Sequence, residues 1–312
     1  MGRLHIISAA VGYKPRNIST FLGSLRLLPS NSTVWMIVRR RDLKEWARLR
    51  TVADLEVQFY PVCRPCSVWV NRLARMICSV RAVSLSNYFN NRATRFLLQL
   101  SLPVSSLRYF CALEIVGSTL LENDDWLLLV DSRDAYFQCC PLEYVADNES
   151  LILLAEEPRP LVRENINYRW LESLYGRKFA ESLLGCQIAC SGTTMGPIEK
   201  IARYLRCMCL ETLRLRRRLW HTFGYDQGIH NFIVHNELVG DVRWCKNGHG
   251  FVWTGARPQM VDAEGVVVNI DGRPVSVVHQ YDRHLRYFES LGFFKKIRTL
   301  GENLIQEMQA LP

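Results

Sequence analysis

Short apolar runs alternate with amphipathic stretches along the first part of the chain. Leu4–Ala10, Thr33–Val38 and Leu55–Val62 are apolar runs of strand length. Between them, Asn17–Leu27 carries apolar residues at helical spacing, and Asp42–Leu49 has the pattern of a polar helix. This β-α-β-α-β order predicts a parallel sheet with right-handed crossovers.

The same alternation continues towards the C-terminus. Trp126–Val130 consists of five consecutive apolar residues, which is typical of a central parallel strand. We expect helices over Ala93–Leu121, with a break near Pro103, and over Pro197–Trp220 and Tyr225–His235. We expect a strand over Leu151–Ala155, a strand leading into a loop at Ile188–Thr194, and short β segments over Gly250–His279. The predicted fold class is therefore α/β, with a Rossmann-like, mostly parallel central sheet flanked by helices and a small β-rich C-terminal part. No shift in composition divides the 312 residues, so we expect a single domain over 1–312.

The net charge of the chain limits the classes of partner that it is expected to bind. A formal net charge of +9 is compatible with nucleic acid, a membrane surface or a phosphorylated ligand. The Lys and Arg residues are spread along the whole chain, which argues against nucleic acid, and the excess of Arg suits a diphosphate. A basic binding module without enzymatic activity is an alternative, although it should cluster its charge on one face.

The cysteines and the lengths of the apolar segments indicate the cellular compartment of the protein. Eleven cysteines form no framework, and Cys63 and Cys66 make a lone C-x-x-C, whereas zinc would need a second pair or spaced histidines. Free, mostly buried thiols are the default, and they indicate a reducing compartment. The start of the chain carries no long apolar region, and no stretch of 18 apolar residues occurs. We therefore expect a cytoplasmic protein without a transmembrane segment.

The central apolar strand ends in the acidic sequence D-S-R-D, residues 131–134. Ligands of open α/β sheets bind at the carboxyl ends of strands, and two carboxylates three residues apart can hold a hard divalent cation. A strand cap in which Arg133 pairs with its acidic neighbours is the equal alternative. His279 ends another apolar run, and with Asp131 and Asp134 it makes a plausible three-ligand set. A lone histidine is, however, more often a hydrogen-bonded core residue.

Two further polar clusters carry candidate chemistry. Asp226, Gln227 and Asn231 crowd polar groups at a predicted helix start, where plain N-capping by Asp226 is the simpler explanation. The sequence C-S-G-T-T, residues 190–194, offers backbone amides and hydroxyls to a sugar or an acceptor. As a turn it would need no function.

In this order the motifs resemble those of GT-A glycosyltransferases. The shared features are a nucleotide-binding first strand, a D-x-D-like acidic cluster after an apolar strand, a C-S-G-x-T loop, a D-Q-x-x-x-N helix and a late histidine. The chain resembles the nucleotide-diphospho-sugar transferases of that superfamily from Ile6 to about His284. A distant similarity extends to the glycogenin-like and lipopolysaccharide galactosyltransferase group. The acidic motif departs from the pattern, because Arg133 stands where a strict D-x-D has its second Asp.

The resemblance implies a function and a division of labour. It implies a single GT-A domain, with 1–135 as the nucleotide-sugar-binding half and 136–312 as the acceptor-binding half. The enzyme would be a hexosyl- or pentosyltransferase that uses a UDP- or GDP-sugar and a glycan, lipid or protein acceptor. Mn²⁺ or Mg²⁺ would assist the leaving diphosphate.

The resemblance also implies roles for individual residues. Asp131, Asp134 and His279 would hold the metal. Asp226 and Gln227 would approach the anomeric carbon. Asp226 or Glu156 would act as base if the enzyme inverts, whereas Asp226 or Gln227 would lie beneath the sugar if it retains. The residues expected to contact the donor are Ala9, Ala10, Tyr13, Arg95, Asp131, Ser132, Arg133, Gly192 and Thr193.

Two other enzyme classes fit the sequence less well. A nucleotidyltransferase that makes nucleotide sugars would share the fold and the metal, but it should carry a Gly-rich loop with a basic residue after the first strand. Residues 8–14 contain one glycine. A phosphatase of the haloacid-dehalogenase type needs a second Asp where Arg133 stands.

Overall fold

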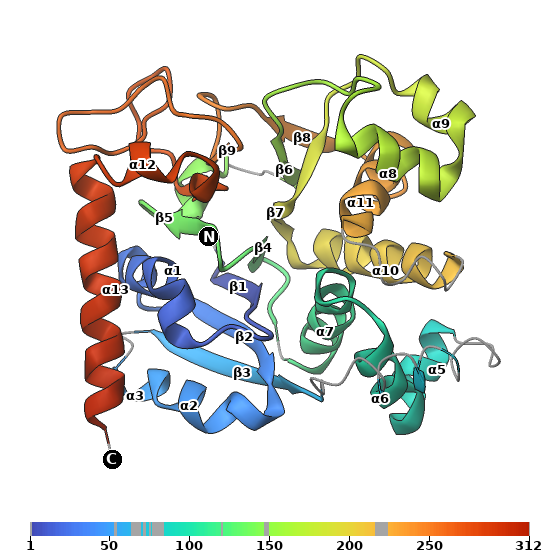
Figure 1. Cartoon of the computed structure of the whole chain (residues 1–312), viewed down its shortest axis with the longest axis horizontal. Coiled ribbons are helices and arrows are strands. Elements are labelled where there is room, and N and C mark those ends of the chain that lie inside the picture. The colour runs from blue at the N-terminus through green and yellow to red at the C-terminus, as the bar shows by residue number, and fades with distance from the viewer. Residues whose placement is uncertain are drawn as a thin grey trace.

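The chain is a mixed α/β protein with a large central sheet and a separate small sheet (Figure 1). The computed structural model describes residues 2–52, 55–63, 70, 73–74, 76, 84–119, 121–146, 150–215 and 224–311. Both halves of the chain contribute strands to the central sheet. In the part of the chain so described, no helix is both long and apolar enough to span a bilayer.

The central sheet has seven strands in the order β3-β2-β1-β4-β7-β6-β8. They are β1 (Leu4–Ala9), β2 (Thr33–Arg39), β3 (Glu56–Val62), β4 (Trp126–Val130), β6 (Ile152–Glu156), β7 (Ala189–Pro197) and β8 (Val242–Cys245). Neighbouring strands are parallel except where β7 pairs with β4 and β6, to both of which it is antiparallel. The predicted mostly parallel sheet is confirmed.

One segment of this sheet differs from the sequence prediction. Residues 190–194 were expected to form a loop, but they lie within β7, where Thr194 pairs with both Leu129 of β4 and Leu154 of β6. Hydrogen bonding on both sides and complete burial keep these small residues in a central strand. The loop prediction at this position is wrong.

One face of the sheet is covered by α1 (Ser19–Ser24), α2 (Leu43–Ala47) and α13 (Gly292–Ala310). The last helix, α13, packs along α1 (Figure 1). The two helices meet at glycines, since a Cβ on Gly301 would lie 2.0 Å from the carbonyl oxygen of Ser19. This contact therefore brings the backbones together with no room for a side chain.

The opposite face is covered by α6 (Arg92–Ser101), α7 (Val104–Ser118), α10 (Ile198–Arg214) and α11 (Tyr225–His235). The expected break near Pro103 separates α6 from α7, because the proline cannot donate within a helix. Apolar side chains of β1, β2 and β4 alternate between the two cores. Burial on both faces explains why these strands read as continuous apolar runs.

The small sheet has the order β5-β10-β9, and in Figure 1 its labelled strands β5 and β9 are drawn above β1, β2 and β3 of the central sheet. Its strands are β5 (Ala135–Phe137), β9 (Val252–Thr254) and β10 (Val277–His279). β10 is antiparallel to β5, with His279 opposite Ala135. This register brings the late histidine next to the end of the acidic sequence 131–134.

The remaining helices differ in part from expectation. The helix expected over Asp42–Leu49 is divided between α2 and α3 (Leu49–Val52), and the expected end of α10 lies outside the described residues. The others are α5 (Leu85–Asn90), α8 (Ile166–Tyr175), α9 (Arg177–Ser182) and α12 (Leu285–Phe288). The sequence pattern predicted neither α8 nor α13.

Candidate functional site

A cleft of about 480 Å³ opens at the carboxyl ends of β1 and β4. The order of the sheet reverses between these strands, since β2 and β3 follow on one side of β1 and β4 lies on the other. Ligands of open α/β sheets bind at such a switch point. Many of the residues singled out from the sequence line this cleft: Ala9, Tyr13, Asp131, Ser132, Arg133, Asp134, Gly192, Asp226, Gln227 and His279.

Hydrogen bonds between strand ends fix the position of the acidic sequence. The Ser132 hydroxyl donates to the carbonyl of Ala9 at 3.0 Å, which links the ends of β4 and β1. On the other side, the amide of Asp131 donates to the carbonyl of Gly192 at 3.0 Å. The carboxylate of Asp131 is therefore held between β1 and β7 by backbone contacts.

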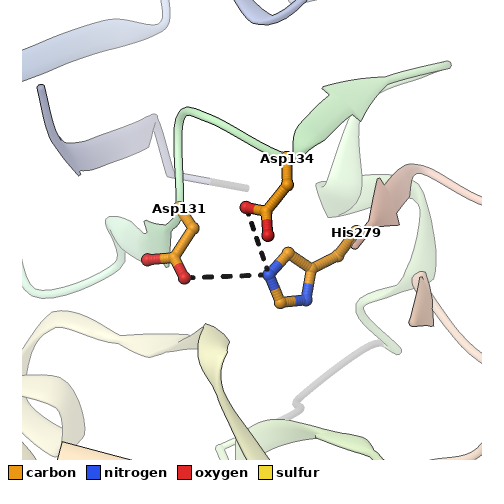
Figure 2. A group of neighbouring side chains, drawn as sticks. All are labelled: Asp131, Asp134 and His279. Atoms are coloured by element: carbon orange, nitrogen blue, oxygen red, sulfur yellow. Dashed lines mark ion pairs between the residues drawn. The ribbon is translucent and has the colours of Figure 1, made fainter. Parts of the chain in front are cut away.

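Asp131, Asp134 and His279 all line the cleft, and Figure 2 shows that their side chains point toward one another. The Nε2 atom of His279 lies 3.8 Å from Asp131 Oδ2 and 3.8 Å from Asp134 Oδ1. These distances exceed those of hydrogen bonds. Two ligands that each lie about 2.1 Å from an ion can stand up to about 4.2 Å apart. The three side chains could therefore hold a divalent ion.

The state of His279 fits this use. The side chain is buried, and among the described residues its Nε2 has no hydrogen-bond partner. Its Nδ1 lies 2.9 Å from the hydroxyl oxygen of Thr254 and 3.6 Å from Sγ of Cys190. Burial lowers the pKa of His279, but its contacts with Cys190 and Asp131 outweigh burial and raise the pKa well above its usual value. An ion would take the place of the proton on Nε2 while the Nδ1 proton is donated to Thr254, which is the tautomer that a metal ligand needs.

Gly192 makes room for this group. A Cβ at this position would lie 2.4 Å from Cε1 of His279, 2.5 Å from its Nε2 and 2.9 Å from Oδ2 of Asp131. Any larger residue would enter the space between histidine and carboxylate. The glycine is thus required by close approach.

The residue after His279 holds two of the three candidate ligands together. Gln280 has a left-handed backbone with φ of 59°, which is uncommon for a residue with a side chain. In this conformation its amide donates to the carbonyl of Asp134 at 2.7 Å. Local backbone strain of this kind is concentrated at functional sites.

Arg108 is a cleft residue that the sequence pattern did not single out. It lies in the second turn of α7, and its guanidinium contacts Oδ1 of Asp131. It also lies 3.2 Å from Oδ2 of Asp226 and donates to the carbonyl of Ser191 at 3.0 Å. The available signal was its place as the only Lys or Arg in the mostly apolar stretch Val104–Ser118, since a buried cation needs partners.

The pKa values of the carboxylates in the cleft shift in opposite directions, because burial dominates for two of them and neighbouring charges for the third. Burial raises the pKa of Asp131, but Arg108 and His279 outweigh it and the pKa falls below its usual value. Burial raises the pKa of Asp134, which His279 opposes and Asp131 reinforces. The pKa of Asp226 is likewise raised by burial, against the effect of Arg108.

The start of α11 brings Asp226 and Gln227 into the cleft. The N-cap is Gly224 in a left-handed conformation, and the Asp226 carboxylate contacts Arg108, so N-capping does not explain this residue. Gln227 accepts a bond from the amide of Ser191 at 2.8 Å and lines the cleft. Asn231 accepts from the amide of Ala189 at 2.9 Å. Gln227 and Asn231 therefore position the first residues of β7.

Four of the expected residues are placed elsewhere. Arg95 pairs with Glu114 at 2.5 Å, and Ala10, Thr193 and Glu156 are buried. None of the four is among the described residues that line the cleft.

The neighbour of Glu156 lines the cleft in its place. Glu157 follows the end of β6, and the Gln227 amide donates to its Oε1 at 3.4 Å. Burial raises the pKa of Glu157, which nearby Arg283 and His279 oppose. The E-E pair at the strand end was visible in the sequence, but which of the two faces the cleft was not.

The nine cysteines among the described residues are free, and five of them are buried. Cys66 of the lone C-x-x-C lies outside the described residues. In comparisons with known proteins, no family model matches this chain, and no curated protein matches it.

Proposed function

We propose that the protein is a GT-A type glycosyltransferase, which moves a hexose or pentose from a UDP- or GDP-linked donor to an acceptor hydroxyl. One observation carries the proposal: Asp131, Asp134 and the unpartnered Nε2 of His279 converge in a cleft at the switch point of the sheet. A switch point suits a nucleotide. An acid–acid–histidine group suits an ion that takes its other ligands from phosphate oxygens.

Asp131, Asp134 and His279 would hold Mn²⁺ or Mg²⁺, whose positive charge, when bound, stabilises the negative charge of the departing diphosphate. Arg108 and Arg133 line the same cleft and supply fixed positive charge for the same group. Ala9, the last residue of β1, and Tyr13 beyond it line the cleft and would contact the nucleoside. The donor thus lies across the ends of β1 and β4.

The transfer exchanges one bond at the anomeric carbon for another. The acceptor oxygen forms a bond to this carbon while the bond to the donor phosphate oxygen breaks, and the electron pair leaves on the diphosphate. The acceptor proton passes to a carboxylate. Asp226 and Glu157 both line the cleft, and burial raises the pKa of each, which favours proton acceptance.

Thermal-shift measurements with UDP, GDP, ADP and CDP, each with and without Mn²⁺, test the proposal. A ligand that binds only the folded state raises the melting temperature, by an amount equivalent to about 2.7 kcal/mol at a hundredfold excess over Kd. We expect one diphosphate to raise it only when Mn²⁺ is present, and Asp131→Ala to remove the effect. Asp241→Ala, at an exposed position, is the control. No response to any of the four diphosphates would contradict the proposal.

A further inference from the structure

Trp170 gives the cleft an aromatic wall. It lies on α8, lines the cleft and is half-buried. The indole packs against the start of α11, where a Cβ on Gly224 would lie 2.1 Å from its Cζ2 atom. One turn later, a Cβ on Gly228 would lie 2.6 Å from a methyl group of Leu174. Glycines at both positions allow α8 to approach α11 closely, which fixes the indole at the cleft.

Trp170 lines the cleft together with two carboxylates, a type of group that can accept hydrogen bonds from hydroxyls. Gly224, which contacts the indole, is two residues before Asp226. Glu157 also lines the cleft, and its pKa is raised, chiefly by burial. The Gln227 amide donates to its Oε1 at 3.4 Å, so this carboxylate is held beside the start of α11, against which the indole packs.

We propose that Trp170 and Glu157 form the acceptor subsite and that the acceptor is a sugar. The inference rests on the proposed function and names its acceptor. A sugar ring has a face of C–H groups and an edge of hydroxyls. The C–H face packs on the negative face of an indole, and the hydroxyl edge donates to a carboxylate.

Other acceptor classes fit these residues less well. An extended peptide gains its affinity by pairing with a strand at the edge of a sheet, whereas this cleft lies at the ends of central strands. A lipid chain needs a continuous apolar wall, whereas Glu157 and Asp226 interrupt the wall around Trp170. A nucleobase could stack on Trp170, but the switch point beside Ala9 is the expected place for the nucleotide.

The test uses the full chain and the variants Trp170→Ala and Trp170→Phe. Calorimetry with UDP and GDP in the presence of Mn²⁺ gives the diphosphate Kd. Transfer from the matching nucleotide sugar to a set of mono- and disaccharides gives the KM of the acceptor. We expect Trp170→Ala to raise the saccharide KM about tenfold while the diphosphate Kd changes less than twofold, and Trp170→Phe to recover most of the loss.

Trp244→Ala is the matched control, because this half-buried tryptophan packs on His235 of α11, away from the indole of Trp170. It should leave both constants unchanged. If the wild type binds a diphosphate but no saccharide serves as acceptor, or if Trp170→Ala and Trp170→Phe leave KM unchanged, the inference fails and the proposed function stands. A weaker diphosphate Kd in both Trp170 variants would assign the indole to the donor and overturn the inference. Failure of the wild type to bind either diphosphate would contradict both the inference and the proposed function.

Discussion

Strand β4 carries an aspartate at each end, and the two are used differently. At its amino end, Asp125 accepts hydrogen bonds from the amides of Arg3 at 2.7 Å and Glu122 at 3.0 Å, and it lies 2.9 Å from Nε2 of His5. Burial raises its pKa, but these contacts outweigh burial and lower it. At the carboxyl end, Asp131 stands 3.8 Å from its histidine.

The difference shows how a structural acid–histidine pair is distinguished from a candidate ligand set. Asp125 and His5 touch, so no atom fits between them. His279 is held apart from its carboxylates by rigid backbone, with Gly192 passing close by and Gln280 in a strained conformation. Residue types alone would not separate the two sites. The distance does, because Nε2 of His5 contacts Asp125 at 2.9 Å, whereas Nε2 of His279 lies 3.8 Å from each of its carboxylates and has no hydrogen-bond partner within the described part of the chain.

Asp131→Ala should have the largest effect. Loss of a ligand, and of the partner of Arg108, is expected to lower the transfer rate by at least about a thousandfold. Asp226 still pairs with Arg108, so the fold should persist. The transfer rate and the circular dichroism spectrum of the variant measure the two effects. An unfolded variant would instead identify Asp131 as a structural strand cap.

Asp125→Ala should lower the stability of the protein and leave its transfer rate nearly unchanged. It removes the acceptor of two backbone amides and the partner of His5, which we expect to lower the free energy of unfolding by about 3 kcal/mol. Urea denaturation measures this loss. The transfer rate of the folded protein should change little, because Asp125 lies at the other end of β4. A large loss of the transfer rate in a fully folded Asp125→Ala protein would contradict the assignment of a structural role to Asp125 and a functional role to Asp131.

His230 extends the comparison to pH. It is fully buried against the hydroxyl of Tyr204, and burial, reinforced by the charge of Arg108, lowers its pKa to about 3. Below pH 6.5 the unfolded chain binds a proton that the folded protein does not, so this histidine makes stability fall as pH falls towards 3. From pH 7 to 5 the loss is about 2 kcal/mol.

Urea denaturation of the wild type and His230→Gln at pH 7 and pH 5 isolates this contribution. The difference in unfolding free energy between the two proteins should shrink at pH 5, because the variant lacks the penalty. Parallel changes in both proteins would show that His230 is protonated in the folded state.

Gly192→Ala should have the smallest effect. The added methyl group would displace His279 from Asp131, which we expect to weaken Mn²⁺ binding about tenfold. Gly117→Ala is the control, since its Cβ would meet nothing within 4 Å. Calorimetric titration with Mn²⁺ compares the two variants. Equal affinities would mean that the space beside Gly192 is not needed for the ion.

The sequence predicted those features that depend on local pattern. Continuous apolar runs identified β1, β2 and β4, and the acidic sequence at the end of β4 located the candidate site. Arg108 and Trp170 were missed, because their role depends on which helix packs beside which strand end. Arg95 was expected at the donor, but Glu114 holds it elsewhere. Contacts distant in sequence decide such positions, and one sequence does not display them.

The packing of α13 on α1 has a consequence for how the protein is made. Residues 292–310 complete the core around the earliest strands, and Gly23 and Gly301 lock the two helices together. During translation, α1 and α2 are synthesised together with strands β1 to β3, but α13 packs on α1 only after residues 292–310 have been synthesised. Until then the nascent chain exposes the apolar surface that chaperones bind.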